Sequence, residues 1–180
     1  ITERVKIVQL LLHHGAAVER KDIENRTALH LAAISGGLDV LPILLDAGAS
    51  VDAKDAIGMS PIAYSSQKGH HRIVEYLITR KCNVTITNIY NQTPLHHASQ
   101  HNHVQCVELL AVHPDLINHQ DCDGSSALSL ACSAGHSLVV DVLLQHKADP
   151  QIPDKDGQVA IHKAAMAGWG EVVDKLISNK

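Results

Sequence analysis

Four histidines lie close together near the middle of the 180-residue chain, at His96, His97, His101 and His103. His97 and His101 are four residues apart, so a helix would place both imidazoles on one face, as two zinc ligands require. A zinc site needs a third and usually a fourth ligand. Cys106 follows closely, but it falls on the next predicted helix and faces elsewhere. We therefore expect no metal site here.

Two acidic segments resemble the first half of a calcium-binding loop, at residues 121–124 and 154–157, where the sequence reads Asp-x-Asp-Gly. A calcium loop of that type places glycine at its sixth position and a bidentate glutamate at its twelfth. Here each glycine comes too early, and the twelfth positions are Cys132 and Ala165. Turn geometry explains both segments better than calcium binding does.

Sequence motifs of catalysis are missing from the chain, which has no HExxH, no GxSxG and no phosphate-cradling loop. Most of the conspicuous histidine, serine and aspartate residues have a counterpart 33 residues away, and a catalytic residue has no reason to recur. We expect no catalytic residue, no cofactor and no enzymatic activity.

A four-residue box recurs every 33 residues without an insertion, which indicates a stack of similar units rather than one globular core. The five boxes are Thr27-Ala28-Leu29-His30, Ser60-Pro61-Ile62-Ala63, Thr93-Pro94-Leu95-His96, Ser126-Ala127-Leu128-Ser129 and Val159-Ala160-Ile161-His162. This period and box resemble the ankyrin repeat. The resemblance implies an all-α solenoid of stacked helix-turn-helix units with projecting β-hairpin fingers. It also implies that the box histidines tie each loop to its neighbour by hydrogen bonds.

One unit illustrates how the residues predict this architecture. Asp55 and Gly58 supply the turn at a hairpin tip, because glycine adopts positive φ freely. Ser60 caps a short first helix, and Gly69 ends it. Leu77 belongs to the apolar stripe of a second helix.

The end of the second helix is less uniform along the chain. Glycine closes it at Gly15 and Gly48, but the equivalent residues are Lys81, Pro114 and Lys147. A lysine in left-handed geometry costs roughly 1 kcal/mol, so we expect those helix ends to be less regular.

The period also divides the chain, which we interpret as a single array over residues 1–180. Residues 1–21 form the latter half of a unit and residues 154–180 a truncated one. The complete units are 22–54, 55–87, 88–120 and 121–153. We expect a monomeric excerpt of a longer chain.

Composition narrows the class of partner. The chain is 45% hydrophobic and 19% charged, with a net charge of -4, so it lacks the electrostatic footprint of a nucleic-acid-binding protein. No apolar stretch is long enough to span a membrane, and no polybasic run suggests direct membrane contact. The four cysteines form no CxxC pair, which is typical of reduced thiols, so we expect an intracellular protein, cytoplasmic or nuclear.

The positions that do not repeat are those that the fold leaves free, and the resemblance implies that they line a concave groove. Aromatic side chains, methionine and arginine are enriched at interface centres, so Tyr64, Tyr90 and Met59 stand out. The full set of predicted partner-binding residues is Arg26, Ile57, Met59, Tyr64, Gln67, Lys68, Tyr90, Gln92, His97, Gln100, His101, Asp123 and Ser125.

The sequence therefore predicts a scaffold that recognises a partner protein or peptide through its hairpin tips and first helices. An alternative is a structural spacer within a longer ankyrin array, in a multidomain or membrane-linked protein, where stacking alone matters. A third hypothesis makes the chain a substrate, because Asn118 resembles the asparagines that hydroxylases modify in ankyrin repeats.

Overall fold

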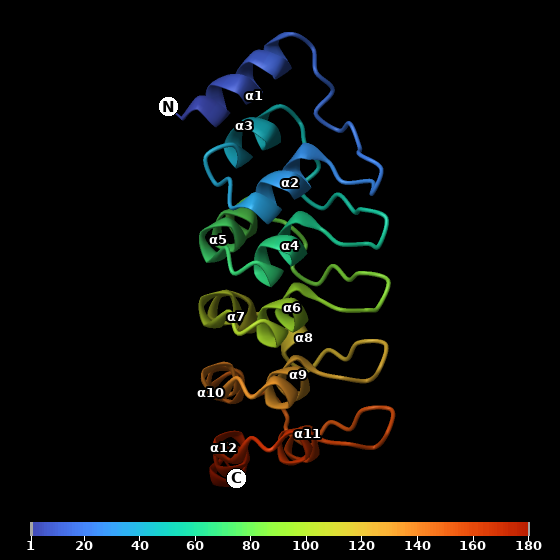
Figure 1. The fold of residues 1–180 in the computed structure, drawn as a ribbon, viewed down its shortest axis with the longest axis vertical. Coiled ribbons are helices and arrows are strands. Elements are labelled where there is room, and N and C mark those ends of the chain that lie inside the picture. The colour runs from blue at the N-terminus through green and yellow to red at the C-terminus, as the bar shows by residue number, and fades with distance from the viewer. Residues whose placement is uncertain (1, 180) are drawn as a thin grey trace.

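The computed structural model describes residues 2–179, in which the secondary structure is helical. Figure 1 shows the helices stacked in one line, with the two ends of the chain at opposite ends of the stack. The helices are α1 (Glu3–His13), α2 (Ala28–Ser35), α3 (Leu41–Asp46), α4 (Pro61–Gln67), α5 (His71–Thr79), α6 (Pro94–Gln100), α7 (Val104–Ala111), α8 (Pro114–Ile117), α9 (Ala127–Ala134), α10 (Ser137–Gln145), α11 (Ala160–Ala167) and α12 (Gly170–Ser178).

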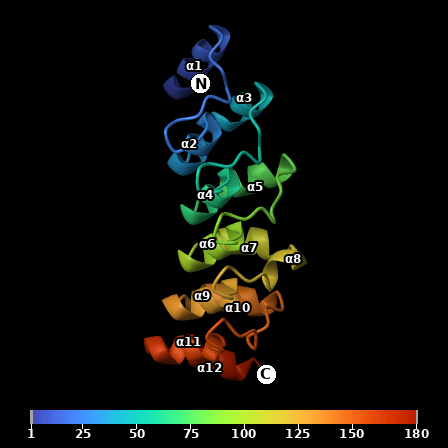
Figure 2. The same cartoon turned by 90° about the vertical axis from the view of Figure 1, so that its right-hand side faces the viewer.

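The helices form two columns. The inner column, next to the projecting loops, consists of α2, α4, α6, α9 and α11, and each of these helices packs on the next. The outer column contains α3, α5, α7, α10 and α12, and Figure 2 shows each beside its inner partner. The short α8 is an extra turn after α7.

Aliphatic side chains at the repeat period form the core between the two columns. Leu29, Ile62, Leu95 and Leu128 are fully buried on the inner helices. Leu110 is fully buried in the same way on the outer helix α7. One helix pair cannot bury its apolar face alone, so the contacts between neighbouring pairs supply most of the stabilisation.

The box histidines link consecutive units, as the resemblance implies. His30 Nδ1 accepts the Thr27 backbone N–H at 3.1 Å, which leaves the proton on Nε2, and Nε2 donates to the Met59 carbonyl at 3.1 Å. His96 makes the equivalent pair of bonds to Thr93 and Ser125. Each histidine thus caps its own helix and holds the loop of the following unit.

A second row of bonds joins the turns between inner and outer helices. Nε2 of His70 donates to the Ile34 carbonyl, and His103 and His136 repeat this bond to carbonyls 36 residues earlier. At the last position Trp169 Nε1 donates to the Ser133 carbonyl at 3.0 Å. The indole therefore takes over the role of the imidazole.

The ends of the outer helices differ partly from the expectation. Lys81 and Lys147 adopt φ of 60° and 66°, the same left-handed conformation as Gly15 and Gly48, so these two ends remain regular. The chain takes a different course only after α7, where Pro114 stands at the equivalent position and starts the additional helix α8.

The loops project as predicted, but their β-hairpin form is not confirmed, because no strand is assigned within residues 2–179. We call residues 22–26, 55–59, 88–92, 121–125 and 154–158 the fingers. Within residues 2–179 the only β-type pairing is an isolated bridge between Gln120 and Ser126. The reason is visible at Asp55, whose carboxylate Oδ1 accepts the N–H groups of Ile57 and Met59 at 3.0 and 2.8 Å. A side chain thus satisfies donors that a strand ladder would otherwise use.

Candidate partner-binding surface

The five fingers form a continuous row. One backbone hydrogen bond joins each finger to the next, and Figure 1 shows the fingers side by side along one edge of the stack. The four bonds are Ala56 N to Glu24 O, Ile89 N to Ile57 O, Cys122 N to Tyr90 O and Lys155 N to Asp123 O, at 2.9–3.1 Å. Backbone bonds therefore hold the tips in register, and the Cys122 thiol adds a weak contact to the Ile89 carbonyl.

The middle of this row exposes large apolar side chains. Ile57, Ile89 and Tyr90 are 44%, 59% and 55% exposed, and they come from two adjacent fingers. Towards the C-terminal end the equivalent positions carry the exposed carboxylates Asp123 and Asp156. In the first finger this position is the exposed Glu24, so the row is apolar in its middle and acidic towards both ends.

Two of the predicted binding residues are engaged within their own fingers. Arg26 pairs with both Asp22 and Glu24, at 2.9 and 2.6 Å. Gln92 accepts a bond from the Asn88 side-chain amide at 3.2 Å. Both side chains shape the finger before any partner arrives.

Tyr64 is half-buried rather than open on the surface. Its hydroxyl donates to Asp55 Oδ2 at 2.6 Å, and its ring lies edge-on to His30 with centroids 6.1 Å apart. Burial and the bond to Asp55 raise the pKa of the phenol well above its usual value of 10.0. Tyr64 therefore braces the finger against α4.

Three predicted binding residues are buried, which removes their side chains from the open surface. Met59, His97 and Ser125 are 2%, 5% and 8% exposed. Met59 and Ser125 are the last residues of their fingers. Their carbonyls accept hydrogen bonds from the box histidines of the preceding unit, and their side chains are buried below the exposed tips. His97 is enclosed within the inner column, and burial lowers its pKa to about 4.

The other inner-helix candidates remain partly or fully exposed. Lys68, Gln100 and His101 are exposed and Gln67 is half-buried. The carbonyls of Gln67 and Gln100 accept the bonds from His103 and His136, so only their side chains are free for contacts.

The paired histidines do not form a zinc-binding arrangement. His101 Nδ1 lies 2.9 Å from the His97 carbonyl, and its ring stacks on His103 at 6.3 Å instead of facing His97. No group of three side chains able to hold a metal ion occurs among residues 2–179.

The cysteines also offer little reactivity. All four are unpaired, and three of them are buried. Burial raises the pKa of Cys82, Cys106 and Cys132 to about 12, so these thiols stay protonated at neutral pH.

Asn118 is exposed at the end of α8, where its Oδ1 accepts the Asp149 backbone N–H at 2.9 Å. The side chain thereby joins the loop of one unit to that of the next. Its hydroxylation stays a prediction.

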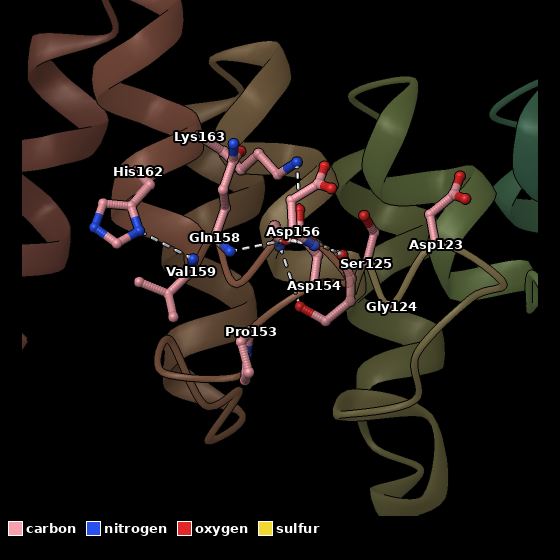
Figure 3. Close-up of polar contacts among 12 residues, drawn as sticks. Asp123, Gly124, Ser125, Pro153, Asp154, Asp156, Gln158, Val159, His162 and Lys163 are labelled. Carbon is pink, nitrogen blue, oxygen red and sulfur yellow. Dashed lines mark hydrogen bonds and ion pairs between the residues drawn. The ribbon is translucent and has the colours of Figure 1, made fainter.

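Sequence reasoning did not include Asp154 and Lys163 among the candidate residues. Figure 3 shows Lys163 reaching from α11 to Asp154 in the last finger, with 2.5 Å between ammonium and carboxylate. The two residues are nine apart, like Asp55 and Tyr64, so a comparison of equivalent positions contains this signal.

The geometry defines a helical repeat protein, built from stacked helix pairs with a row of loops along one edge. The family model described as ankyrin repeats (3 copies) matches residues 1–55, 51–116 and 111–180. The chain belongs to the ankyrin repeat family. Its members are generally non-enzymatic modules for protein interaction. A search of curated proteins found no match, and no helix within residues 2–179 is long and apolar enough to cross a membrane.

Proposed function

We propose that this chain is an intracellular scaffold module that binds a partner protein or peptide across the fingers and the inner helices. The observation that carries the proposal is the exposed apolar group at Ile57, Ile89 and Tyr90, which occupies adjacent tips in the middle of the row. Large exposed apolar side chains that lie together are typical of interaction sites.

The arrangement of the fingers supports the same conclusion. Backbone bonds fix the spacing of the tips before binding, so a partner does not have to order them. The exposed Lys68, Gln100 and His101 lie at the C-terminal ends of the inner helices α4 and α6 and offer polar groups there for a partner that extends along these helices. The chain acts as a monomer, and its contacts with the partner are non-covalent and need no cofactor.

Affinity capture from cells with quantitative mass spectrometry tests this function. The wild-type chain is compared with the double variant Ile57→Ser/Tyr90→Ser and with the control Leu138→Ser, which alters an exposed apolar residue on the outer helix α10. We expect a set of proteins that the tip variant loses and the control retains, followed by direct binding to the purified partner. Equal capture by all three proteins would contradict the proposal and favour the spacer alternative.

A further inference from the structure

The first residue of each finger has two polar atoms, and only one of them closes the turn. In the second finger Oδ2 of Asp55 accepts the hydroxyl of Tyr64, nine residues further on. In the fifth finger the Lys163 ammonium occupies the same place beside Asp154. In the first and third fingers a residue four positions further on supplies the contact, through the pairs Asp22–Arg26 and Asn88–Gln92.

The fourth finger is the exception. Asp121 Oδ1 accepts the N–H groups of Asp123 and Ser125, at 2.9 and 2.8 Å, which closes the turn as in the other fingers. Its Oδ2 makes no hydrogen bond or ion pair among residues 2–179, and it keeps contact with solvent although Asp121 as a whole is only 8% exposed. An incoming donor can therefore reach this oxygen, and a charged donor would form a charge-assisted hydrogen bond with it.

The sequence explains why no internal donor arrives. The residue nine positions beyond Asp121 is Leu130, where the second and fifth fingers have Tyr64 and Lys163, and Ser125 does not supply the contact that Arg26 and Gln92 make in the first and third fingers. Leucine is shorter than tyrosine or lysine and has no polar atom, so the place of the hydroxyl or ammonium stays empty. Leu130 is half-buried and offers an apolar floor.

The surroundings do not neutralise the charge of Asp121. The histidines of the neighbouring inner helix α6 are His96 and His97, and burial lowers the pKa of each to about 4, so both imidazoles are neutral at pH 7. On the same finger Asp123 adds a second, exposed carboxylate. On the adjacent finger Lys155 is exposed and forms no ion pair with Asp121 within the described part of the chain.

We propose that Asp121 is the anchor for a lysine or arginine side chain of the partner, which enters above Leu130 and occupies the position that Lys163 takes beside Asp154. The aliphatic stem of that residue packs on Leu130 while its charged head reaches Oδ2. This inference rests on the proposed function and specifies its partner as a polypeptide with a basic residue next to an apolar one. The apolar residue contacts Tyr90 in the preceding finger.

A peptide selected on the wild-type protein provides the probe. A displayed library of random 12-residue peptides is selected on the chain, and binding of the purified peptide is measured by calorimetry. Its basic residue is then replaced by norleucine, which keeps most of the stem and removes the charge. The same two peptides are measured against Asp121→Asn.

Asparagine is a conservative test at this position, because Asn88 closes its own finger with Oδ1 bonds of 3.0 Å to Tyr90 N and Gln92 N. We expect norleucine to weaken binding at least tenfold on the wild-type protein and less than twofold on Asp121→Asn. Leu130→Lys should also weaken the parent peptide about tenfold, since it supplies the missing internal cation, whereas Leu130→Met should not.

The outcomes separate this inference from the proposed function. One outcome overturns only the role of Asp121: the selected peptides require Ile57 and Tyr90, but they contain no basic residue, or norleucine weakens their binding equally on the wild-type protein and on Asp121→Asn. Peptides that bind regardless of Ile57, Tyr90 and Asp121, or a selection without binders, overturn the proposed function as well.

Discussion

The hydroxyl of Tyr64 donates a hydrogen bond of 2.6 Å to Oδ2 of Asp55, and this contact joins an inner helix to the finger that precedes it. Tyr64→Phe keeps the ring and leaves a largely buried carboxylate oxygen unpaired. We expect a loss of about 1–2 kcal/mol in the free energy of unfolding, measured by urea denaturation. Tyr90→Phe is the matched control, because that ring is exposed, and it should change stability by less than about 0.5 kcal/mol. Equal effects of the two substitutions would contradict a bracing role for Tyr64.

Leu110 is fully buried on α7, in the middle of the stack. Leu110→Ala should lower the free energy of unfolding by about 2–5 kcal/mol, because it opens a cavity between units that stabilise one another. Circular dichroism during urea denaturation measures the change. Leu138→Ala, on the exposed side of α10, should have little effect, and a comparable loss there would argue against the assignment of the core.

Gly58 lies where two fingers approach closely. Its φ is +77°, and an added Cβ would lie 3.1 Å from the Asn88 Cα of the next finger. Gly157 has nearly the same φ, +74°, but a Cβ there would meet nothing within 4 Å. Both alanine variants should therefore lose about 1 kcal/mol through backbone strain, and only Gly58→Ala should lose more and shift the amide signals of Ile89 in NMR spectra. Identical behaviour of both variants would show that the fingers are not in contact there.

Acid should destabilise the stack through His97. Burial lowers its pKa from 6.5 to about 4, so the folded state binds fewer protons than the unfolded state between these values. Its contribution is fully present above pH 6.5 and is lost as the pH falls towards 4, by an amount on the order of 3 kcal/mol.

A leucine variant separates this effect from general acid unfolding. Leu31 and Leu130 occupy the equivalent position in other units, so His97→Leu fits the inner column. It should reduce the difference in stability between pH 7.5 and pH 5, measured by denaturation at both pH values. His13→Gln, at an exposed position of α1, should leave that difference unchanged. An unchanged pH dependence in His97→Leu would assign the acid sensitivity to other groups, beginning with the buried His96.

The repeat period made much of the fold predictable, because residues such as Leu29 and Leu95 recur where neighbouring units pack. It also predicted the turns, since Asn25 and Asn91 have positive φ like the glycines at the same position. The predicted β-hairpins are not confirmed, and the reason is local: the hydrogen-bonding capacity of a side chain such as Asp55 does not appear in a hydrophobic pattern.

The candidate site was less predictable than the fold. A residue that does not repeat can be exposed, like Tyr90, or enclosed, like Met59, and the period does not separate the two cases. The difference depends on contacts across units, such as the bond from His30 to the Met59 carbonyl. The unpaired oxygen of Asp121 is equally absent from the sequence pattern, because it depends on which side chain reaches the first residue of each finger in three dimensions.

The bonds from Ile89 to Ile57 and from Cys122 to Tyr90 use only main-chain atoms, so the exposed side chains of Ile57, Ile89 and Tyr90 are not needed to align the loops. Substitutions of these exposed side chains can consequently change the binding surface along this edge one residue at a time, while the spacing of the fingers persists. A lineage of such proteins can change what it recognises without rebuilding its frame.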